Sequence, residues 1–321
     1  MITFIASGGH KYAAERIANM PGAPDIQIWS YNRLLRKKKL PVGTYIFTDF
    51  DRLTYWHLEL ASLIYRELRD AGATVLNDPA RALQRLPLLK QLHHRGHNSF
   101  QVWDAAVDGL PDRYPVFLRT RNGHRGTLTE LLETAQDAEA ELESAIEDGY
   151  VVGDLMFVEY RAQPTEDGVF RKLAMFRVGE TMIATPAVHE RDWQAKLGEE
   201  GVASAQMYQE DYDLVATNRY ADAVSQAFDV AKIDYGRADY AIVDGKVEIY
   251  EINTNPFIDP LTSHPHAVRL KTDALFCDRL VAALREIDRP VSKTEFAALD
   301  GDEFVLQRQQ DRLVFHDRWV S

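Results

Sequence analysis

The chain has 321 residues, of which 45% are hydrophobic and 27% charged, and its formal net charge is −12. This composition excludes an intrinsically disordered chain, and the length predicts two or three sub-domains rather than one core. The negative charge argues against nucleic acid and anionic membrane surfaces as partners, because both are bound mainly through lysine and arginine.

The first part of the chain is predicted to alternate strands with helices, which is typical of an α/β layer with a parallel sheet. The basic run Arg36–Lys39 within it is interpreted as a solvated loop. The expected strands cover residues 1–6, 26–29, 45–48 and 74–76, and the expected helices cover residues 11–20 and 58–71.

The rest of the chain predicts a mixture of helices and antiparallel strands. Helices are expected over 81–95, 127–147 (with Thr127 or Thr129 as N-cap), 212–228 and 272–287, a strand over 151–160, and hairpins over 173–185 and 238–253.

Targeting and redox signals are absent from the sequence. The N-terminus lacks the basic and apolar regions of a signal peptide, and no run approaches the ~20 apolar residues of a membrane helix. The single cysteine, Cys277, excludes an intrachain disulfide and fits a reducing compartment. We therefore expect a cytoplasmic protein.

The most informative segment is the hairpin over residues 236–256, which reads GRADYAIVDGKVEIYEINTNP. Strand side chains alternate between two faces, so Glu251 and Asn253 share one face, and Asp239 on the preceding strand can meet them. Two carboxylates and an amide oxygen are ligands suited to Mg²⁺. The alternative is that Glu251 and Asn253 only cap and solvate the end of a strand.

The register of this hairpin decides between these interpretations. A three-residue loop of Val243, Asp244 and Gly245 places Asp239 on the same face as Glu251. A strict two-residue Asp-Gly turn places Asp239 on the opposite face. The metal site is therefore predicted to need the longer loop.

The pattern Arg237-x-Asp239, then Asp-Gly, then Glu251-x-Asn253-Thr254-x-Pro256 resembles the C-terminal core of ATP-grasp enzymes, and especially the D-alanine–D-alanine ligases and related carboxylate–amine ligases. The resemblance implies that Asp239, Glu251 and Asn253 hold two Mg²⁺ ions on ATP, with Mn²⁺ as a substitute, and that Arg237 stabilises the oxyanion of a tetrahedral intermediate. Between residues 75 and 260 the order of elements also matches.

The resemblance further implies contacts to the ATP phosphates. Arg85, with Lys90 as the alternative, and Arg119 take the places of two family lysines, and Gly123 and Gly126 belong to a phosphate-binding glycine loop. Arginine keeps the charge of lysine but is a rigid fork, which changes the expected phosphate pose. Read alone, the segment 116–126 is a basic surface turn.

The base and ribose contacts are expected near the strand 154–160, which takes the place of the family's hinge strand. Glu159 and Tyr160 are the candidates there, and the alternative is an ordinary core strand. Arg171, beside Lys172, is a further candidate for a phosphate or substrate contact.

The resemblance implies an ATP-grasp fold of the α/β (α+β) class with four parts. These are an N-terminal α/β domain over 1–84, a lid sub-domain over 85–160, a core sub-domain with the metal site over 161–290, and an extension over 291–321.

The implied activity is ATP-dependent ligation of a carboxylate to an amine or thiol through an acylphosphate, on a small-molecule or peptide substrate. A homodimer is a family-level expectation. The alternatives are an ATP-grasp phosphotransferase acting on a small molecule and a non-catalytic nucleotide-binding module.

Overall fold

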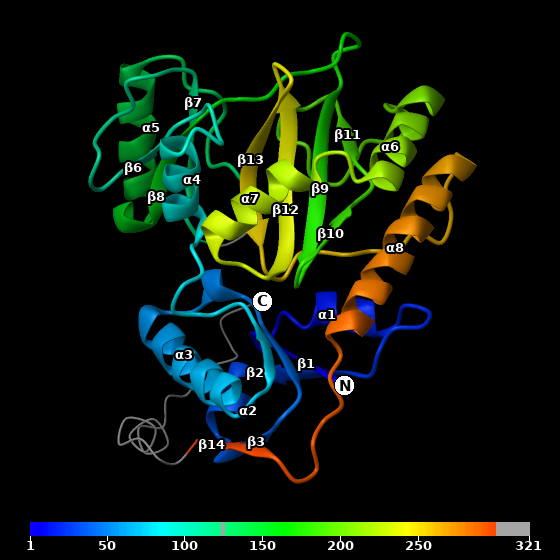
Figure 1. Cartoon of the computed structure of the whole chain (residues 1–321). Helices are drawn as coiled ribbons and strands as arrows, with labels where there is room; N and C mark the ends of the chain where they lie inside the picture. Colours follow the sequence, from blue (N-terminus) through cyan, green and yellow to red (C-terminus); the bar gives the residue numbers. More distant parts are fainter. Residues whose placement is uncertain (123–125, 300–321) are drawn as a thin grey trace.

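The structure is a computed structural model, and it describes residues 1–122 and 126–299. The N-terminal sheet has four parallel strands in the order β2-β1-β4-β5, as the alternation of elements predicted. This part of the chain is the blue and cyan ribbon at the bottom of Figure 1. The elements of this part are β1 (Ile2–Ala6), α1 (Tyr12–Ala18), β2 (Ile26–Ser30), α2 (Tyr31–Leu35), β3 (Lys39–Pro41), β4 (Thr44–Phe47), the short helix η1 (Phe50–Arg52), α3 (Tyr55–Asp70) and β5 (Thr74–Leu76).

A three-stranded antiparallel sheet follows, in the order β6-β8-β7. Its elements are α4 (Arg85–His94), β6 (Val102–Asp104), β7 (Val116–Thr120), α5 (Ala135–Glu147), η2 (Val152–Asp154) and β8 (Leu155–Glu159).

The helix expected over 127–147 is wrong in its first part. Leu128 donates its amide to the Leu118 carbonyl, and Leu132 exchanges two backbone bonds with Val116, so this segment runs beside β7. The helix begins only after Thr134, whose hydroxyl accepts the Asp137 amide as an N-cap. Pairing with β7 satisfies the backbone groups that a first helical turn would otherwise have used.

The third sheet has the order β10-β9-β12-β13, and β11 pairs with the other end of β9. Its elements are β9 (Phe170–Val178), β10 (Thr181–Ala184), β11 (Val188–Glu190), α6 (Ala205–Thr217), α7 (Ala221–Ala231), β12 (Tyr235–Val243), β13 (Lys246–Asn253) and α8 (Ala267–Ile287). The two predicted hairpins in this part of the chain are confirmed.

The single helix expected over 212–228 is wrong, because two helices meet there. Asn218 ends α6 in the left-handed conformation at φ 55°. Its side chain accepts the Ala184 amide at 2.7 Å and donates to the Met182 carbonyl at 2.6 Å. Asparagine tolerates this backbone conformation, and the two bonds to β10 hold the break in place.

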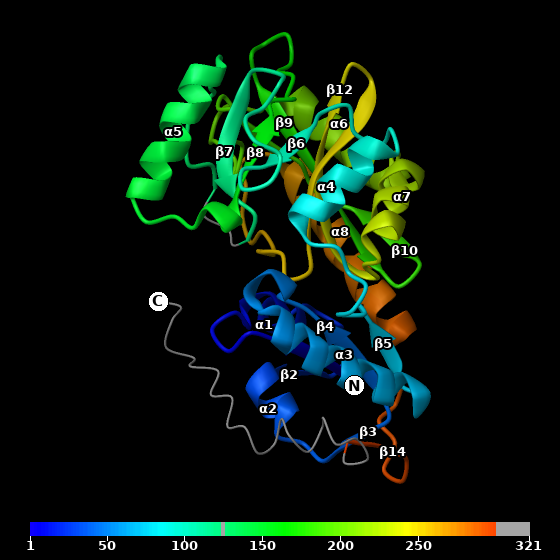
Figure 2. The ribbon, with the colours of Figure 1, turned by 90° about the vertical axis from the view of Figure 1, so that its left-hand side faces the viewer.

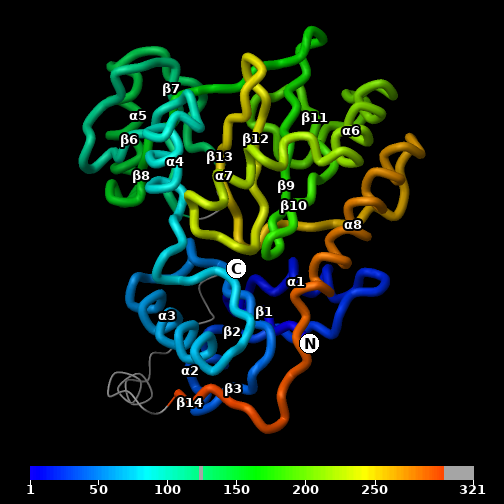
Figure 3. Tube along the Cα trace, in the orientation of Figure 1, coloured from blue at the N-terminus to red at the C-terminus, as the bar shows by residue number. Residues whose placement is uncertain are grey.

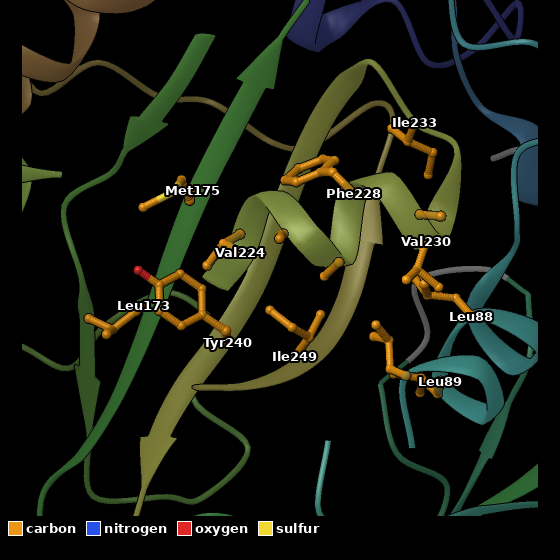
Figure 4. Close-up of a cluster of buried hydrophobic side chains, with 14 of the residues drawn as sticks. Leu88, Leu89, Leu173, Met175, Val224, Phe228, Val230, Ile233, Tyr240 and Ile249 are labelled. Carbon is orange, nitrogen blue, oxygen red and sulfur yellow. The ribbon is translucent and has the colours of Figure 1, made fainter. Parts of the chain in front are cut away.

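The largest apolar cluster lies between α7 and the third sheet. Figure 4 shows Phe228 and Val224 of α7 over Tyr240 and Ile249, and all four side chains are buried. Leu89 of α4 belongs to the same cluster, so packing joins the helix that carries Arg85 to the strands of the hairpin.

The β12–β13 hairpin corrects the predicted register. Asp244 and Gly245 form a two-residue turn with φ of 50° and 77°, so the expected three-residue loop is absent. Tyr240 pairs with Ile249, but Asp239 pairs with Glu251, so Tyr250 is one extra residue in β13. The short turn alone would place Asp239 opposite Tyr250. The β-bulge shifts the register by one residue, so Asp239 lies opposite Glu251.

Asn77, which follows β5 and is fully buried, binds the open end of this hairpin at the start of β12. The Asn77 amide donates to the carbonyls of Phe47 and Tyr235 at 2.9 and 2.8 Å, and it accepts the amides of Asp234 and Tyr235 at 2.8 Å each. All four hydrogen-bonding positions of the side chain are therefore used, and the start of β12 is fixed.

Asp49 holds the second strand at the same end of the hairpin, where β13 runs into Thr254 and Asn255. The Asp49 carboxylate accepts the Ser7 amide at 2.7 Å and the Asn255 side-chain amide at 2.9 Å, and the Asp49 amide donates to the Thr254 hydroxyl at 3.0 Å. Figure 2, turned by 90°, shows the N-terminal sheet below the two other sheets.

The chain returns to the N-terminal sheet after α8. β14 (Phe296–Ala298) pairs with β3, and the Thr44 hydroxyl donates to the Ile287 carbonyl at 2.7 Å. The tube in Figure 3 follows this return of the chain beneath the N-terminal sheet. Residues 300–321 of the expected extension lie outside the described residues.

Among the helices that the structure describes, none combines the length and the apolar character needed to cross a membrane.

We expect Asn77→Ala to lower the free energy of unfolding by about 3–5 kcal/mol, because it leaves several buried backbone groups unpaired. Urea denaturation measures this loss. The control is Asn19→Ala, at an exposed asparagine that makes a single bond to the Glu15 carbonyl, and there a change within about 1 kcal/mol is expected. Equal effects at both sites would contradict the role of Asn77.

Stability is also expected to depend on pH through Asp49. Burial raises the pKa of Asp49 from 3.8 to about 6, against the hydrogen bonds from Ser7 and Asn255. The folded state therefore keeps a proton that the unfolded chain has already released, so the free energy of unfolding falls as the pH rises through about 4 to 6.

Relative to Asp49→Asn, the wild-type chain should lose roughly 2.4 kcal/mol of stability between pH 4 and pH 7. Denaturation curves at several pH values measure the difference. Glu180→Gln, at a side chain that is 98% exposed, should leave the wild-type pH dependence intact. Parallel pH profiles for wild type and Asp49→Asn would refute the assignment.

Candidate functional site

The site is built on the ends of β12 and β13 that lie near the N-terminal sheet. Asp239 pairs with Glu251 and Arg237 pairs with Asn253 across the two strands. Gly236 permits this approach, because a Cβ there would lie only 2.7 Å from the backbone oxygen of Asn253. The three predicted metal ligands and Arg237 are therefore brought together.

Two guanidinium groups hold Glu251. Its Oε2 lies 2.5 Å from Arg85 Nη2 and 3.7 Å from Arg119 Nη2, and its Oε1 accepts the Asn253 side-chain amide at 2.9 Å. Burial by itself would raise the pKa of Glu251, but the charges of Arg85 and Arg119 outweigh it and hold that pKa well below its usual range. Glu251 is therefore ionised at any working pH.

Arg119 is the second buried charge in this group. Burial lowers the pKa of Arg119 to about 10, repulsion by Arg85 adds to the lowering, and Glu251 opposes it. The guanidinium is therefore still positive at neutral pH. Its Nε is buried and has no hydrogen-bond partner among the residues that the structure describes, which leaves a donor for an incoming anion.

Asp239 is also held by cations, one from its own strand and one from β9. Arg237 donates to both of its carboxylate oxygens, at 2.7 and 3.2 Å, and Lys172 Nζ of β9 lies 3.8 Å away. Arg237 also donates to the Phe257 carbonyl at 2.8 Å, and the attraction of Asp239 keeps the pKa of Arg237 raised despite its burial. Asp239 is only 4% exposed, so these cations are its main partners.

A cavity of about 260 Å³ opens beside these groups, between the three-stranded sheet and the third sheet. Asp239, Glu251 and Arg119 lie on its wall, together with Lys172. Its lining also includes the apolar side chains of Leu89, Phe100, Phe117, Val158, Phe170 and Trp193. The cavity is therefore lined by both charged and apolar side chains.

The predicted glycine loop lies only partly within the described residues. Gly126 borders the cavity, whereas Gly123 falls in residues 123–125, which lie outside the described part. Lys196 lies against this loop, because a Cβ on Gly126 would come 2.8 Å from its Nζ. Basic groups therefore approach the cavity from two directions.

The predicted base and ribose residues also border the cavity. The Glu159 carboxylate accepts the Gln101 amide at 2.8 Å and lies 3.6 Å from Arg113, while the Tyr160 ring meets Trp193 edge-on at 5.5 Å. The hinge after β8 therefore contributes to the lining of the cavity.

Arg171 is placed differently from the other basic candidates. It borders the cavity, but its guanidinium lies 2.5 Å from the buried Asp211 and 3.5 Å from Glu210, both on α6. Its neighbour Lys172 is the one that reaches Asp239.

Three residues that line this cavity have no recognisable pattern in the sequence. Trp193 and Lys196 lie in the irregular segment after β11, where no periodicity or motif selects them. Tyr250 reads as an ordinary strand residue until the bulge is known.

The donor chemistry of this group fits a hard cation. No group of three or more His, Cys, Asp or Glu side chains within residues 1–122 and 126–299 is placed to hold a metal ion. The set on the hairpin has two carboxylates and an amide, which suits Mg²⁺ because that ion takes few protein ligands and completes its shell with phosphate and water.

No protein-family model and no curated protein matches the sequence. Solved structures do resemble the fold. One is the ATP-grasp ligase PsnB complexed with a phosphomimetic variant of its minimal precursor, Mg and ADP, at 12% identity and a TM-score of 0.50, covering 89% of this chain and 96% of that one.

Two further structures lie just below that level of similarity. D-alanine–D-alanine ligase from Bacillus anthracis has 15% identity and a TM-score of 0.48, covering 88% of this chain and 98% of its own. D-cycloserine synthetase DcsG has 13% identity and a TM-score of 0.48, covering 88% and 99%. The sheet order and the match to the PsnB complex agree with the resemblance seen in the sequence, and the chain has an ATP-grasp fold.

Proposed function

We propose that this protein is an ATP- and Mg²⁺-dependent ligase that joins a carboxylate to an amine through an acylphosphate. The observation that carries the proposal is the set of charges around the two carboxylates that line the cavity. Four cations, Arg85, Arg119, Lys172 and Arg237, surround the two carboxylates of Asp239 and Glu251. This leaves an excess of two positive charges that are mostly shielded from water.

Such an excess favours a polyanion bound together with a cation. Uncompensated buried charges are costly, so the site is more stable with triphosphate beside the arginines and a metal between the carboxylates. The apolar rings of Trp193 and Phe117 in the lining suit contact with a nucleotide base, and the cavity volume of about 260 Å³ suits a small ligand. The PsnB structure, which contains Mg and ADP, supports this assignment.

Each side chain has a role in this proposal. Asp239, Glu251 and Asn253 would hold Mg²⁺, with Mn²⁺ as a substitute, and the bound metal would neutralise the transferring phosphoryl group. Arg119 and Arg85 would bind phosphate oxygens, Lys172 would add charge at the same wall, and Arg237 would stabilise an oxyanion. Catalysis would come from positioning and charge, since no covalent nucleophile is required.

We expect Glu251→Gln to lower ATP turnover roughly 100-fold and to remove most of the effect of Mg²⁺ on nucleotide affinity. The reason is the loss of an anionic ligand that faces Asp239. Calorimetric titration of ADP with and without Mg²⁺ measures the effect on nucleotide affinity. The variant is expected to be less stable, because Arg85 and Arg119 lose their counter-charge, so the titration is done below its melting temperature.

The matched control is Glu248→Gln, because Glu248 is a buried carboxylate on the same strand that accepts the Ser99 amide at 2.9 Å and does not border the cavity. It should lose stability but keep the Mg²⁺ dependence. If Glu251→Gln bound ADP with an unchanged response to Mg²⁺, the metal assignment would be abandoned.

The reaction itself is tested by a substrate screen that pairs ATP with candidate carboxylates and amines, including short peptides. Ligation predicts ADP release that requires both acceptors, together with a condensed product in the mass spectrum. ADP release with one acceptor and a stable phosphorylated product would show a phosphotransferase instead. Nucleotide binding without turnover across the screen would favour a non-catalytic module.

A further inference from the structure

The bulge residue Tyr250 faces the same cavity as its neighbour Glu251. In a regular strand, consecutive side chains point to opposite faces, so only one of the two could do so. The extra residue interrupts that alternation. Two successive residues of β13 can therefore serve one ligand.

The hydroxyl of Tyr250 has a specific partner. It donates to the Arg161 carbonyl at 2.6 Å, and Arg161 lies in the hinge directly after Tyr160. The centroid of the Tyr250 ring lies 6.0 Å from that of Phe100, which also lines the cavity.

The tip of the same hairpin adds two further bonds to the hinge. The Asp244 carboxylate pairs with the Arg161 guanidinium, and the Asp244 amide donates to the Gln163 side chain at 2.9 Å. The hinge segment 160–163 is therefore attached to the β12–β13 hairpin at three points. Tyr250 is the attachment that borders the cavity and adjoins Glu251.

We propose that Tyr250 is a nucleotide-positioning residue, whose hydroxyl fixes the hinge carbonyl of Arg161 so that a base is held at the correct distance from a phosphate-bound metal at Glu251. This inference rests on the proposed function, since it assumes an adenine nucleotide in the cavity. The carbonyl has two lone pairs, so a bond to Tyr250 leaves one for the ligand and restricts its direction. The role is separate from metal binding, because the tyrosine is not an oxygen ligand of the proposed site.

Tyr250→Phe tests the inference, since it keeps the ring and removes only the donor. ADP is titrated by calorimetry without Mg²⁺, and inorganic tripolyphosphate, which has no base, is titrated in parallel. We expect the affinity for ADP to fall about tenfold and that for tripolyphosphate to stay within about twofold. In steady-state assays KM for ATP should rise more than kcat falls.

The matched control is Tyr45→Phe, because the Tyr45 hydroxyl also donates to a backbone carbonyl, that of Pro41 at 2.8 Å, but lies in the N-terminal part away from the cavity. It should lose comparable stability and bind both ligands as the wild type does. Tyr250→Leu is a second variant, which keeps an apolar side chain at the bulge and should repeat the pattern of Tyr250→Phe.

Three results would overturn the positioning role. One is a Tyr250→Phe variant that binds ADP like the wild type, which leaves the proposed function intact. Another is an equal loss for ADP and tripolyphosphate, which indicates general distortion of the site. The third is a wild-type chain that binds no ADP, which removes the proposed function as well, so the two failures are distinguishable.

Discussion

The pairing of Asp239 with Glu251 across the β12–β13 hairpin is the constraint on which the site depends. A tight Asp-Gly turn sets one register near the hairpin tip, and the bulge at Tyr250 shifts it by one residue before the carboxylates are reached. A slip of one residue moves side chains to the other face of a sheet. With a regular β13, one carboxylate would point away from the cavity, and no joint ligand set would exist.

Charge holds this arrangement together. Glu251 of β13 is bound by guanidinium groups from two other elements, Arg85 of α4 and Arg119 of β7. Asp239 is bound by Arg237 of its own strand, β12. Arginine presents a planar fork with several donors, whereas lysine is a compact point charge. Arg85 uses its fork to reach Glu251 and also the carbonyls of Thr120 and Arg121, so one side chain links three segments around the cavity.

The alternation of strands and helices was sufficient to predict the parallel N-terminal sheet, and the spacing of Arg237, Asp239, Glu251 and Asn253 was sufficient to predict their convergence. The predicted three-residue loop was wrong, and the bulge at Tyr250 that takes its place could not be predicted, because a bulge leaves no local pattern in an apolar strand. The helix start at Thr134 was missed because residues 128–132 pair with β7 instead of forming a helical turn, and the break at Asn218 was missed because it is held by bonds to β10. Trp193 and Lys196 reach the cavity through tertiary packing alone.

The return of the chain to its beginning has a consequence for biosynthesis. Leu40 of β3 is completely buried, and its strand neighbour is Ala297, more than 250 residues later. During translation β3 has no strand partner until that late segment is made, and the apolar side chain of Leu40 lacks its cover in the meantime. Closing so long a loop is slow, so the nascent protein should depend on chaperones until its final strand has emerged from the ribosome.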